Sequence, residues 1–370
     1  PKREVEYQML YGMAEPVRSA LIKMGERVRV YAPVGELLPG MAYLVRRLLE
    51  NTSNESFLRR GFAEGVSKDV LLAPPAPNGN ASSAQPAPAP KADVPGPFVN
   101  EPHADFSRKE NRDAIQAAIE KLRGELGRLY PLHIGGKDVK TDRVLESLNP
   151  ANPSEVVAKI CQASRAEAEL AMKAAAAAFP AWRDTAPEVR ADYLMKMAAE
   201  MRKRKWDLSA LMVLEVGKSW READADTGEA IDFCEYYARE MLRLSKPRNP
   251  RRSGPVPGEA NVLFYQARGV GIVISPWNFP LAILTGMSVA GIVAGSTVIV
   301  KPAEPSNAIA AALNEVFKAV KLPPGVANFC PGKGSEVGQF LVEHKDTAFV
   351  ALTPNSIVDL NYLSAVYLQP

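Results

Sequence analysis

The sequence predicts an α/β protein whose main part is a doubly wound parallel sheet. The prediction rests on the residues after 268, where short and uniformly apolar segments alternate with helical segments across short loops. Strands that are buried on both faces lack the alternation of polar and apolar side chains, and parallel sheets covered by helices are built of such strands. A proline- and alanine-rich stretch separates this part from an N-terminal segment.

We expect four strands and three connecting helices after residue 268. The strands are expected at 269–275, 297–301, 326–329 and 347–352, and the helices at 281–294, 307–320 and 335–344. The first of these helices is apolar and rich in small residues, as is typical of a helix that packs closely on a sheet. In an open sheet of this kind, ligands bind at the carboxyl ends of the strands.

Local signals indicate the elements before residue 268. Apolar residues recur at helical spacing from Ile115 to Leu129, which predicts an amphipathic helix. The segment 133–141 is expected to form a hairpin around Gly135 and Gly136. Three S/T-x-x-E sequences predict capped helix starts: Ser107 with Glu110, Ser164 with Glu167, and Thr185 with Glu188.

Composition divides the chain of 370 residues into four parts. Residues 1–66 are dense in apolar and charged residues, and 67–105 form a linker whose segment 72–97 holds eight prolines. Residues 106–353 form the α/β part, and 354–370 form a tail of different character. Because the chain begins at Pro1, we expect it to be a piece of a longer product.

Charge and cysteine content exclude several classes of function. A net charge of +3, from 45 basic and 42 acidic side chains, gives no reason to expect a nucleic-acid partner. Three histidines and three cysteines without metal-ligand spacing predict no metal site. A sparse, odd set of cysteines favours a reducing compartment, so we expect a cytoplasmic protein.

A membrane span at 281–300 is the alternative for the α/β part. No charged residue occurs from 269 to 300, and Gly291 and Gly295 form a G-x-x-x-G pattern. Against this interpretation, Pro276 and the other proline of the same loop interrupt the apolar run, and its ends are rich in β-branched residues.

The loop 275–280, with the sequence SPWNFP, follows the first strand of the sheet. The side-chain amide of Asn278 is suited to stabilising a developing oxyanion, and Trp277 offers a flat apolar wall. The alternative is a rigid turn in which Asn278 bonds the backbone. After the second strand, Lys301 and Glu304 suit the ribose of a nucleotide, or else form a solvated pair beside a turn.

The third strand ends in a glycine-rich turn, 330–338, that opens the next helix. Such a helix start favours phosphate, although the turn is not a Walker A sequence. We expect Cys330 to be a core residue, because its neighbours are apolar. In the N-terminal part, the helical segment 43–51 carries Arg46 and Arg47, which suit a carboxylate ligand. The alternative is an exposed Arg46–Glu50 pair.

The segment from roughly Leu129 to Leu352 resembles the Rossmann-like NAD-binding domain of the aldehyde dehydrogenase superfamily. The resemblance is carried by three motifs that occur in this order: SPWNFP, VIVKPAEPS and PGKGSEVG. The segments RVYAPVGEL and YLVRRLLENTSNESF resemble the last β/α unit of the TIM-like barrel of proline dehydrogenase. Together they resemble the proline utilization A family of bifunctional bacterial enzymes, which oxidise proline to glutamate.

The resemblance implies NAD-dependent oxidation of L-glutamate γ-semialdehyde (1-pyrroline-5-carboxylate), with FAD-dependent proline oxidation upstream. It implies that Asn278 is the oxyanion donor and that NAD is held by Ile274, Ser275, Pro276, Trp277, Lys301, Glu304 and Gly334. It also implies a proline pocket made by Tyr31, Tyr43, Arg46, Arg47 and Glu50. A homo-oligomer and peripheral membrane contact are further properties that the resemblance allows.

The chain departs from the family after the fourth strand. It reads Leu-Thr-Pro-Asn-Ser at 352–356, where the family has Phe-Thr-Gly-Ser, and the rest of the tail matches nothing in the family. The family's nucleophilic cysteine and general-base glutamate have no counterpart. We therefore expect an inactive, truncated product with a frameshifted tail. The alternative is a non-catalytic fragment that binds a nucleotide or a partner.

Overall fold

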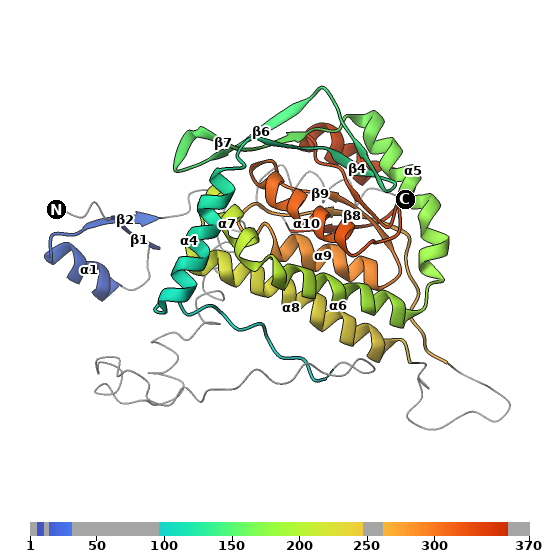
Figure 1. Ribbon diagram of the computed structural model, residues 1–370, viewed down its shortest axis with the longest axis horizontal. Coiled ribbons are helices and arrows are strands. Elements are labelled where there is room, and N and C mark those ends of the chain that lie inside the picture. The colour runs from blue at the N-terminus through green and yellow to red at the C-terminus, as the bar shows by residue number, and fades with distance from the viewer. Residues whose placement is uncertain (1–5, 11–14, 32–95, 247–261, 354–370) are drawn as a thin grey trace. The chain divides into compact units, whose positions relative to one another are not determined.

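The computed structural model describes residues 6–10, 15–31, 96–246 and 262–353 (Figure 1). The chain divides into two compact units, Pro1–Ala89 and Pro90–Pro370. The predicted linker from 67 to 95 and the predicted tail 354–370 lie outside the described residues.

The first unit contains a β/α/β segment: β1 (Glu6–Leu10), α1 (Glu15–Lys23) and β2 (Arg27–Tyr31). The two strands pair in parallel, with Glu6 opposite Arg27 and Leu10 opposite Tyr31. Gly25, at φ +79°, allows the sharp turn between α1 and β2, since its left-handed conformation is open to glycine without strain. A parallel pair joined by a helix is the repeating element of a β/α barrel.

The second unit holds eight helices and nine strands among its described residues. The helices are α4 (Lys109–Arg123), α5 (Arg165–Arg183), α6 (Pro187–Lys203), α7 (Lys205–Val216), α8 (Trp220–Leu244), α9 (Ala282–Val293), α10 (Asn307–Ala319) and α11 (Gln339–Glu343). The strands are β3 (Arg128–Tyr130), β4 (Leu132–Ile134), β5 (Lys137–Val139), β6 (Val144–Asn149), β7 (Asn152–Cys161), β8 (Val270–Ile274), β9 (Thr297–Lys301), β10 (Ala327–Phe329) and β11 (Thr347–Leu352).

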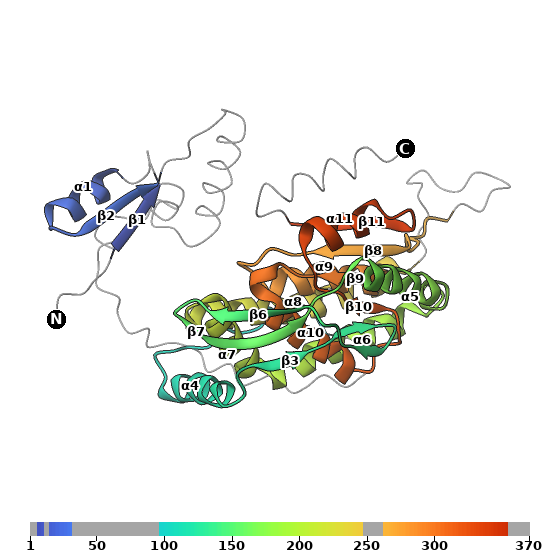
Figure 2. The same cartoon turned by 90° about the horizontal axis from the view of Figure 1, so that it is seen from above.

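The main sheet has six strands in the order β11-β8-β9-β10-β4-β5, with β11 beside β8 at one edge (Figure 2). The first four strands are parallel, which confirms the predicted sheet. The predicted hairpin is also confirmed: Gly135 and Gly136, at φ +58° and +81°, connect β4 and β5. The hairpin extends the sheet, because β4 pairs antiparallel with β10, where His133 is opposite Phe329. The N–H of Gly135 also donates to Oδ1 of Asn328 on β10 at 2.9 Å.

Helices cover both faces of the parallel strands, as in a doubly wound fold. Val273, Val298 and Val300 face the layer of α6, α8, α9 and α10. Ile272 and Ile299 point the other way, toward α5 and the segment around α11. In Figure 1, α6 and α8 run below the sheet and α5 lies at its right-hand side. A smaller sheet, β3-β7-β6, completes the unit.

One of the three predicted capping boxes is confirmed. Ser164 Oγ accepts from the N–H of Ala166 at 3.1 Å, and the Glu167 carboxylate accepts from the N–H of Ser164 at 2.7 Å. The boxes at Ser107 and Thr185 are wrong, because α4 and α6 begin without a side-chain cap. Thr185 instead donates its hydroxyl proton to the carbonyl of Ala181 at the end of α5.

Two further differences concern helix ends. The amphipathic helix ends at Arg123, so Leu129, which the helical spacing included, lies in β3. A capping box that we did not predict starts α8, where Ser219 and Glu222 bond each other's backbone. Its sequence, S-x-x-E, carries the ordinary signal.

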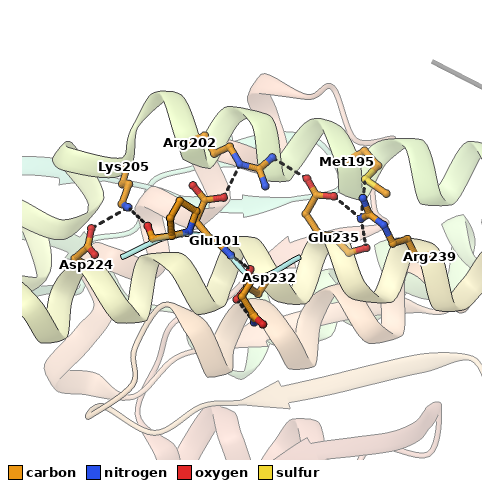
Figure 3. Close-up of polar contacts among 10 residues, drawn as sticks. Glu101, Met195, Arg202, Lys205, Asp224, Asp232, Glu235 and Arg239 are labelled. Carbon is orange, nitrogen blue, oxygen red and sulfur yellow. Dashed lines mark hydrogen bonds and ion pairs between the residues drawn. The ribbon is translucent and has the colours of Figure 1, made fainter. Parts of the chain in front are cut away.

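Residues 96–105, the last part of the predicted linker, are bonded to α6 and α8 (Figure 3). The N–H of Glu101 donates to Asp232 Oδ1 at 2.6 Å, and the Glu101 carboxylate contacts Arg202 Nε at 2.7 Å. The N–H of Ala104 donates to Asp224 Oδ2 at 2.7 Å. Residues 96–105 are therefore attached to the second unit, because acidic side chains of α8 accept hydrogen bonds from the backbone N–H groups of Glu101 and Ala104.

The alternative of a membrane span at 281–300 is wrong. The segment contains the helix α9, of 12 residues, followed by a turn at Gly295 with φ +91° and then by β9. A spanning helix needs about 20 apolar residues. Within the described ranges, none of the helices has the length and apolarity to cross a bilayer.

Candidate active site at the carboxyl ends of the parallel strands

The carboxyl ends of the four parallel strands are level with one another. Ile274 at the end of β8 is opposite Lys301 of β9 and also opposite Leu352 of β11. On the far side of β9, the N–H of Cys330 donates to the carbonyl of Val300 at 3.0 Å. The loops that carry Asn278, Lys301, Glu304 and Gly334 therefore leave the sheet at the same edge, as the order of motifs predicted.

This edge contains the point where the strand order reverses. The chain passes from β8 to β9 to β10 in one direction, and then returns to place β11 on the other side of β8. Two loops that diverge at such a point leave a crevice between them, and doubly wound proteins bind ligands there. The loop after β8 lies directly at this position.

Glu304 links the loops that follow β9 and β10. It begins a short 3-10 turn, η2 (Glu304–Ser306), and its Oε1 accepts from the N–H of Gly334 at 3.4 Å. Lys301, at the last position of β9, is 5% exposed. The alternative of a solvated Lys301–Glu304 pair is therefore wrong for the lysine, whereas the Glu304 side chain is exposed and accessible to a ligand.

The glycine-rich turn differs from the prediction. It starts as a π-helical turn, η3 (Gly334–Gly338), and the α-helix α11 begins only at Gln339. The N–H groups of Glu336 and Val337 donate to the Lys333 carbonyl at 3.1 and 2.8 Å. The turn uses the N–H of Glu336 itself, whereas the bond of Val337 to the N-cap carbonyl is the first bond of any helix. That this helix start favours a phosphate stays a prediction.

A glycine is required within this turn for packing. A Cβ on Gly332 would lie 2.6 Å from Cγ2 of Val337 and 3.2 Å from the Ala163 carbonyl. Glycine at this position thus allows the chain after β10 to pack closely against Val337 and Ala163. This packing requires glycine whether or not a ligand binds at the edge.

The loop after β8 combines buried and exposed residues. Ser275 and Pro276 are buried, whereas Trp277 and Phe279 are 46% and 44% exposed. Asn278 is half-buried, and its side chain forms no hydrogen bond to any other residue that the structure describes. The alternative in which Asn278 bonds the backbone is therefore not observed, and the amide is available to a ligand.

Asn278 lines a cavity of about 380 Å³ between this loop and the α7–α8 region. The other lining residues are Val216, Gly217, Lys218, Glu222, Ala225, Trp277 and Phe279. A larger cavity of about 660 Å³ lies beside α9 and β11, and none of the predicted site residues lines it. The smaller cavity is therefore the one adjacent to the candidate chemistry.

The three cysteines of the chain, Cys161, Cys234 and Cys330, are all buried and unpaired. Burial raises the pKa of the Cys330 thiol to about 12, and it raises the pKa of the Cys234 thiol as well. The expectation that Cys330 is a core residue is confirmed. None of the three presents an accessible thiol at the edge where the strands end, because all three are buried and a nucleophilic cysteine needs exposure.

Two buried carboxylates near the site were not predicted from the sequence. Asp226 on α8 and Glu215 on α7 accept hydrogen bonds from the first N–H groups of α9 and α10, respectively. A glutamate inside the apolar run LMVLEV was the available signal for Glu215, since acidic residues are rarely buried without partners.

The predicted proline pocket falls almost entirely outside the described residues. This applies to Tyr43, Arg46, Arg47 and Glu50, and to the side chain of Tyr31, whose backbone ends β2. These roles stay predictions.

Comparisons with known proteins agree with both units. Residues 137–359 match the aldehyde dehydrogenase family, and residues 1–60 match proline dehydrogenase. A 1-pyrroline-5-carboxylate dehydrogenase from Geobacillus thermodenitrificans is 50% identical over 275 residues, which are 74% of this chain and 53% of that protein. The chain thus spans about half the length of the curated relatives that it matches.

Solved structures give the same picture. Proline utilization A from Bdellovibrio bacteriovorus, inactivated by N-propargylglycine, matches 100% of this chain and 38% of its own, with 45% identity and a TM-score of 0.72. The 1-pyrroline-5-carboxylate dehydrogenase from Thermus with bound NAD matches 74% of this chain and 52% of its own, with 48% identity and a TM-score of 0.71. With the level strand ends and the family match over 137–359, the chain belongs to the aldehyde dehydrogenase family.

Proposed function

We propose that the second unit is the NAD-binding part of a 1-pyrroline-5-carboxylate dehydrogenase, which oxidises L-glutamate γ-semialdehyde to glutamate. The observation that carries the proposal is the register of β8 and β9, which brings the loops of Asn278 and Lys301 to one edge. The names of the relatives, at 45–50% identity, support the substrate class.

The residues at this edge fit a dinucleotide. NAD, when bound, accepts the hydride. The Lys301 ammonium, held at the end of β9, and the exposed Glu304 carboxylate would bind the hydroxyl groups of the adenosine ribose. The segment Ile274–Trp277 would line the cofactor, and Gly334, whose N–H contacts Glu304, would let its backbone approach the adenosine part.

Asn278 would act on the aldehyde. Its amide N–H groups donate hydrogen bonds, and the adjoining cavity of about 380 Å³ has room for a small aliphatic aldehyde. As negative charge grows on the carbonyl oxygen, a fixed donor stabilises it more than it stabilises the neutral carbonyl. Removal of one such donor typically costs on the order of 10²- to 10³-fold in rate.

We further propose that residues 1–370 bind NAD without turnover. Oxidation in this family needs a thiolate that attacks the aldehyde, and the three cysteines of the chain are buried in the core. Residues 1–370 would then correspond to the alternative of a non-catalytic nucleotide-binding fragment. Purified chain that reduces NAD in the presence of the semialdehyde would contradict this part of the proposal.

For the first unit, the proposal is a segment of a proline dehydrogenase barrel that uses FAD in the whole enzyme. The parallel β1–α1–β2 segment and the match of residues 1–60 support it.

Thermal unfolding with and without NAD tests the cofactor proposal. A ligand that binds only the folded state raises the melting temperature. We expect NAD to stabilise the chain, and we expect Lys301→Met and Glu304→Gln to weaken that stabilisation. Lys109→Met is the control for the loss of a lysine charge, because Lys109 is exposed on α4 and lines neither cavity. If NAD fails to shift the transition of the unsubstituted chain, the proposal is wrong.

A further inference from the structure

The helix α9 begins directly after the loop that carries Asn278, yet its own residues do not cap it. Leu281 occupies the N-cap position and makes no side-chain hydrogen bond. The first backbone N–H groups of a helix have no partner within the helix, and burial makes an unpaired donor costly. The start of α9 is buried at Leu281 and Ala282, so a partner from elsewhere is needed.

Asp226, on the neighbouring helix α8, supplies that partner. Its Oδ1 accepts from the N–H of Ala282 at 2.6 Å. Burial raises the pKa of the Asp226 carboxyl, while Lys218 and the backbone N–H groups at the start of α9 oppose that shift. A carboxylate at a helix start is also favoured by the positive end of the helix dipole.

Lys218 connects the carboxylate to the middle of the loop. Its Nζ lies 2.7 Å from Asp226 Oδ2, and the two side chains are 10% and 0% exposed. The same Nζ lies 4.4 Å from the centre of the Phe279 ring, within the range of a cation–π contact. The ion pair therefore contacts the chain at two places after Asn278: at Phe279 in the loop and at Ala282 at the start of α9.

Asn278 immediately precedes one of these two contacts and lines the same cavity as Lys218. We propose that Lys218 and Asp226 are positioning residues for Asn278. The buried ion pair fixes the segment 277–282, from the loop to the start of α9, so that the Asn278 amide faces the cavity. The inference rests on the proposed oxyanion role of Asn278. Neither Lys218 nor Asp226 takes part in a chemical step in this proposal.

The side-chain amide signal of Asn278 in a nuclear magnetic resonance spectrum of the full chain tests the proposal. Its loss in Asn278→Asp identifies the signal. Removing one charge would leave the other buried and unpaired, so the main variant is the double substitution Lys218→Met with Asp226→Asn. Asparagine retains an oxygen that can accept from Ala282. We expect the Asn278 signal to move or broaden beyond detection.

The chain offers a closely matched control, a second buried lysine–aspartate pair whose aspartate also lies on α8. Lys205 Nζ lies 3.0 Å from Asp224 Oδ1, with side chains 15% and 1% exposed, and this pair holds residues 102–104 instead of the loop (Figure 3). We expect Lys205→Met with Asp224→Asn to leave the Asn278 signal in place. The proposal is overturned if both double variants move the signal equally, or if neither does.

Two additional measurements keep the outcomes separate. If the double variant does not fold, Lys218→Arg decides, because arginine retains the charge for Asp226 but changes the contact with Phe279. A displaced Asn278 signal then supports positioning, and an unmoved signal overturns it. The NAD-dependent rise in melting temperature, measured on the same samples, reports on the proposed function. Its absence in the unsubstituted chain refutes that function without altering the meaning of the Asn278 signal.

Discussion

Glu215 makes the stability of the second unit depend on pH. Its carboxylate is 3% exposed and accepts from the N–H groups of Ala308 and Ile309, at 2.6 and 2.8 Å, and from Ser147 Oγ at 2.7 Å. Burial raises the pKa of Glu215 from 4.5 to about 7, although the three hydrogen bonds oppose the shift. The folded chain therefore retains a proton on Glu215 at pH values where the unfolded chain has released it.

The sign of the effect follows from this difference. A raised pKa in the folded state adds stability that is fully present below about pH 4.5 and is lost as the pH rises to about 7. One pKa unit corresponds to about 1.4 kcal/mol, so the free energy of unfolding should fall by about 3 kcal/mol across this window because of Glu215.

Urea unfolding of the original chain and of Glu215→Gln, across this range of pH, measures the effect. Glutamine does not titrate, so the difference in unfolding free energy between the two proteins should change by about 3 kcal/mol from the acid to the neutral end. Ser147→Ala removes one donor to the carboxylate and should move the window to higher pH. A difference between original and variant that stays constant with pH would refute the reasoning.

Three other predictions concern packing and caps. Ser219→Ala should lower the free energy of unfolding by about 1 kcal/mol in urea because it removes the cap of α8, whereas Ser107→Ala should change it little because Ser107 caps no helix. Gly271→Ala places a Cβ 2.2 Å from Phe349 and should cost about 1–3 kcal/mol, with partial recovery in a double variant with Phe349→Leu. The three cysteines should react with a thiol reagent only after unfolding; rapid reaction of the native chain would contradict their burial.

Local pattern was sufficient for the strands after residue 268 and for the helices α9 and α10, but not for the start of α11. Each expected strand there agrees with β8, β9, β10 or β11 to within a residue or two at its ends. Uniformly apolar segments of five or six residues, bounded by glycine or proline, allow few other structures. The hairpin at Gly135 and Gly136 was equally local, because two adjacent residues with positive φ select the tight turn.

The candidate site was predictable only in part. The motif order placed Asn278, Lys301 and Glu304 after consecutive strands, and parallel strands end at one edge. The burial of Lys301 and the π-helical start at Gly334 were not predictable, because both depend on how the loops after β9 and β10 pack against each other.

By itself the sequence determined the alternation of strand and helix, and through its ordered motifs the family. Tertiary structure alone decided that β11 lies beside β8, that β4 joins the sheet, and that Asp226 and Glu215 cap helices far away in the chain. The physical reason is distance along the chain: periodicity and turn chemistry act between near neighbours. A donor at Ala282 finds its acceptor at Asp226, 56 residues earlier, only after the layers have packed.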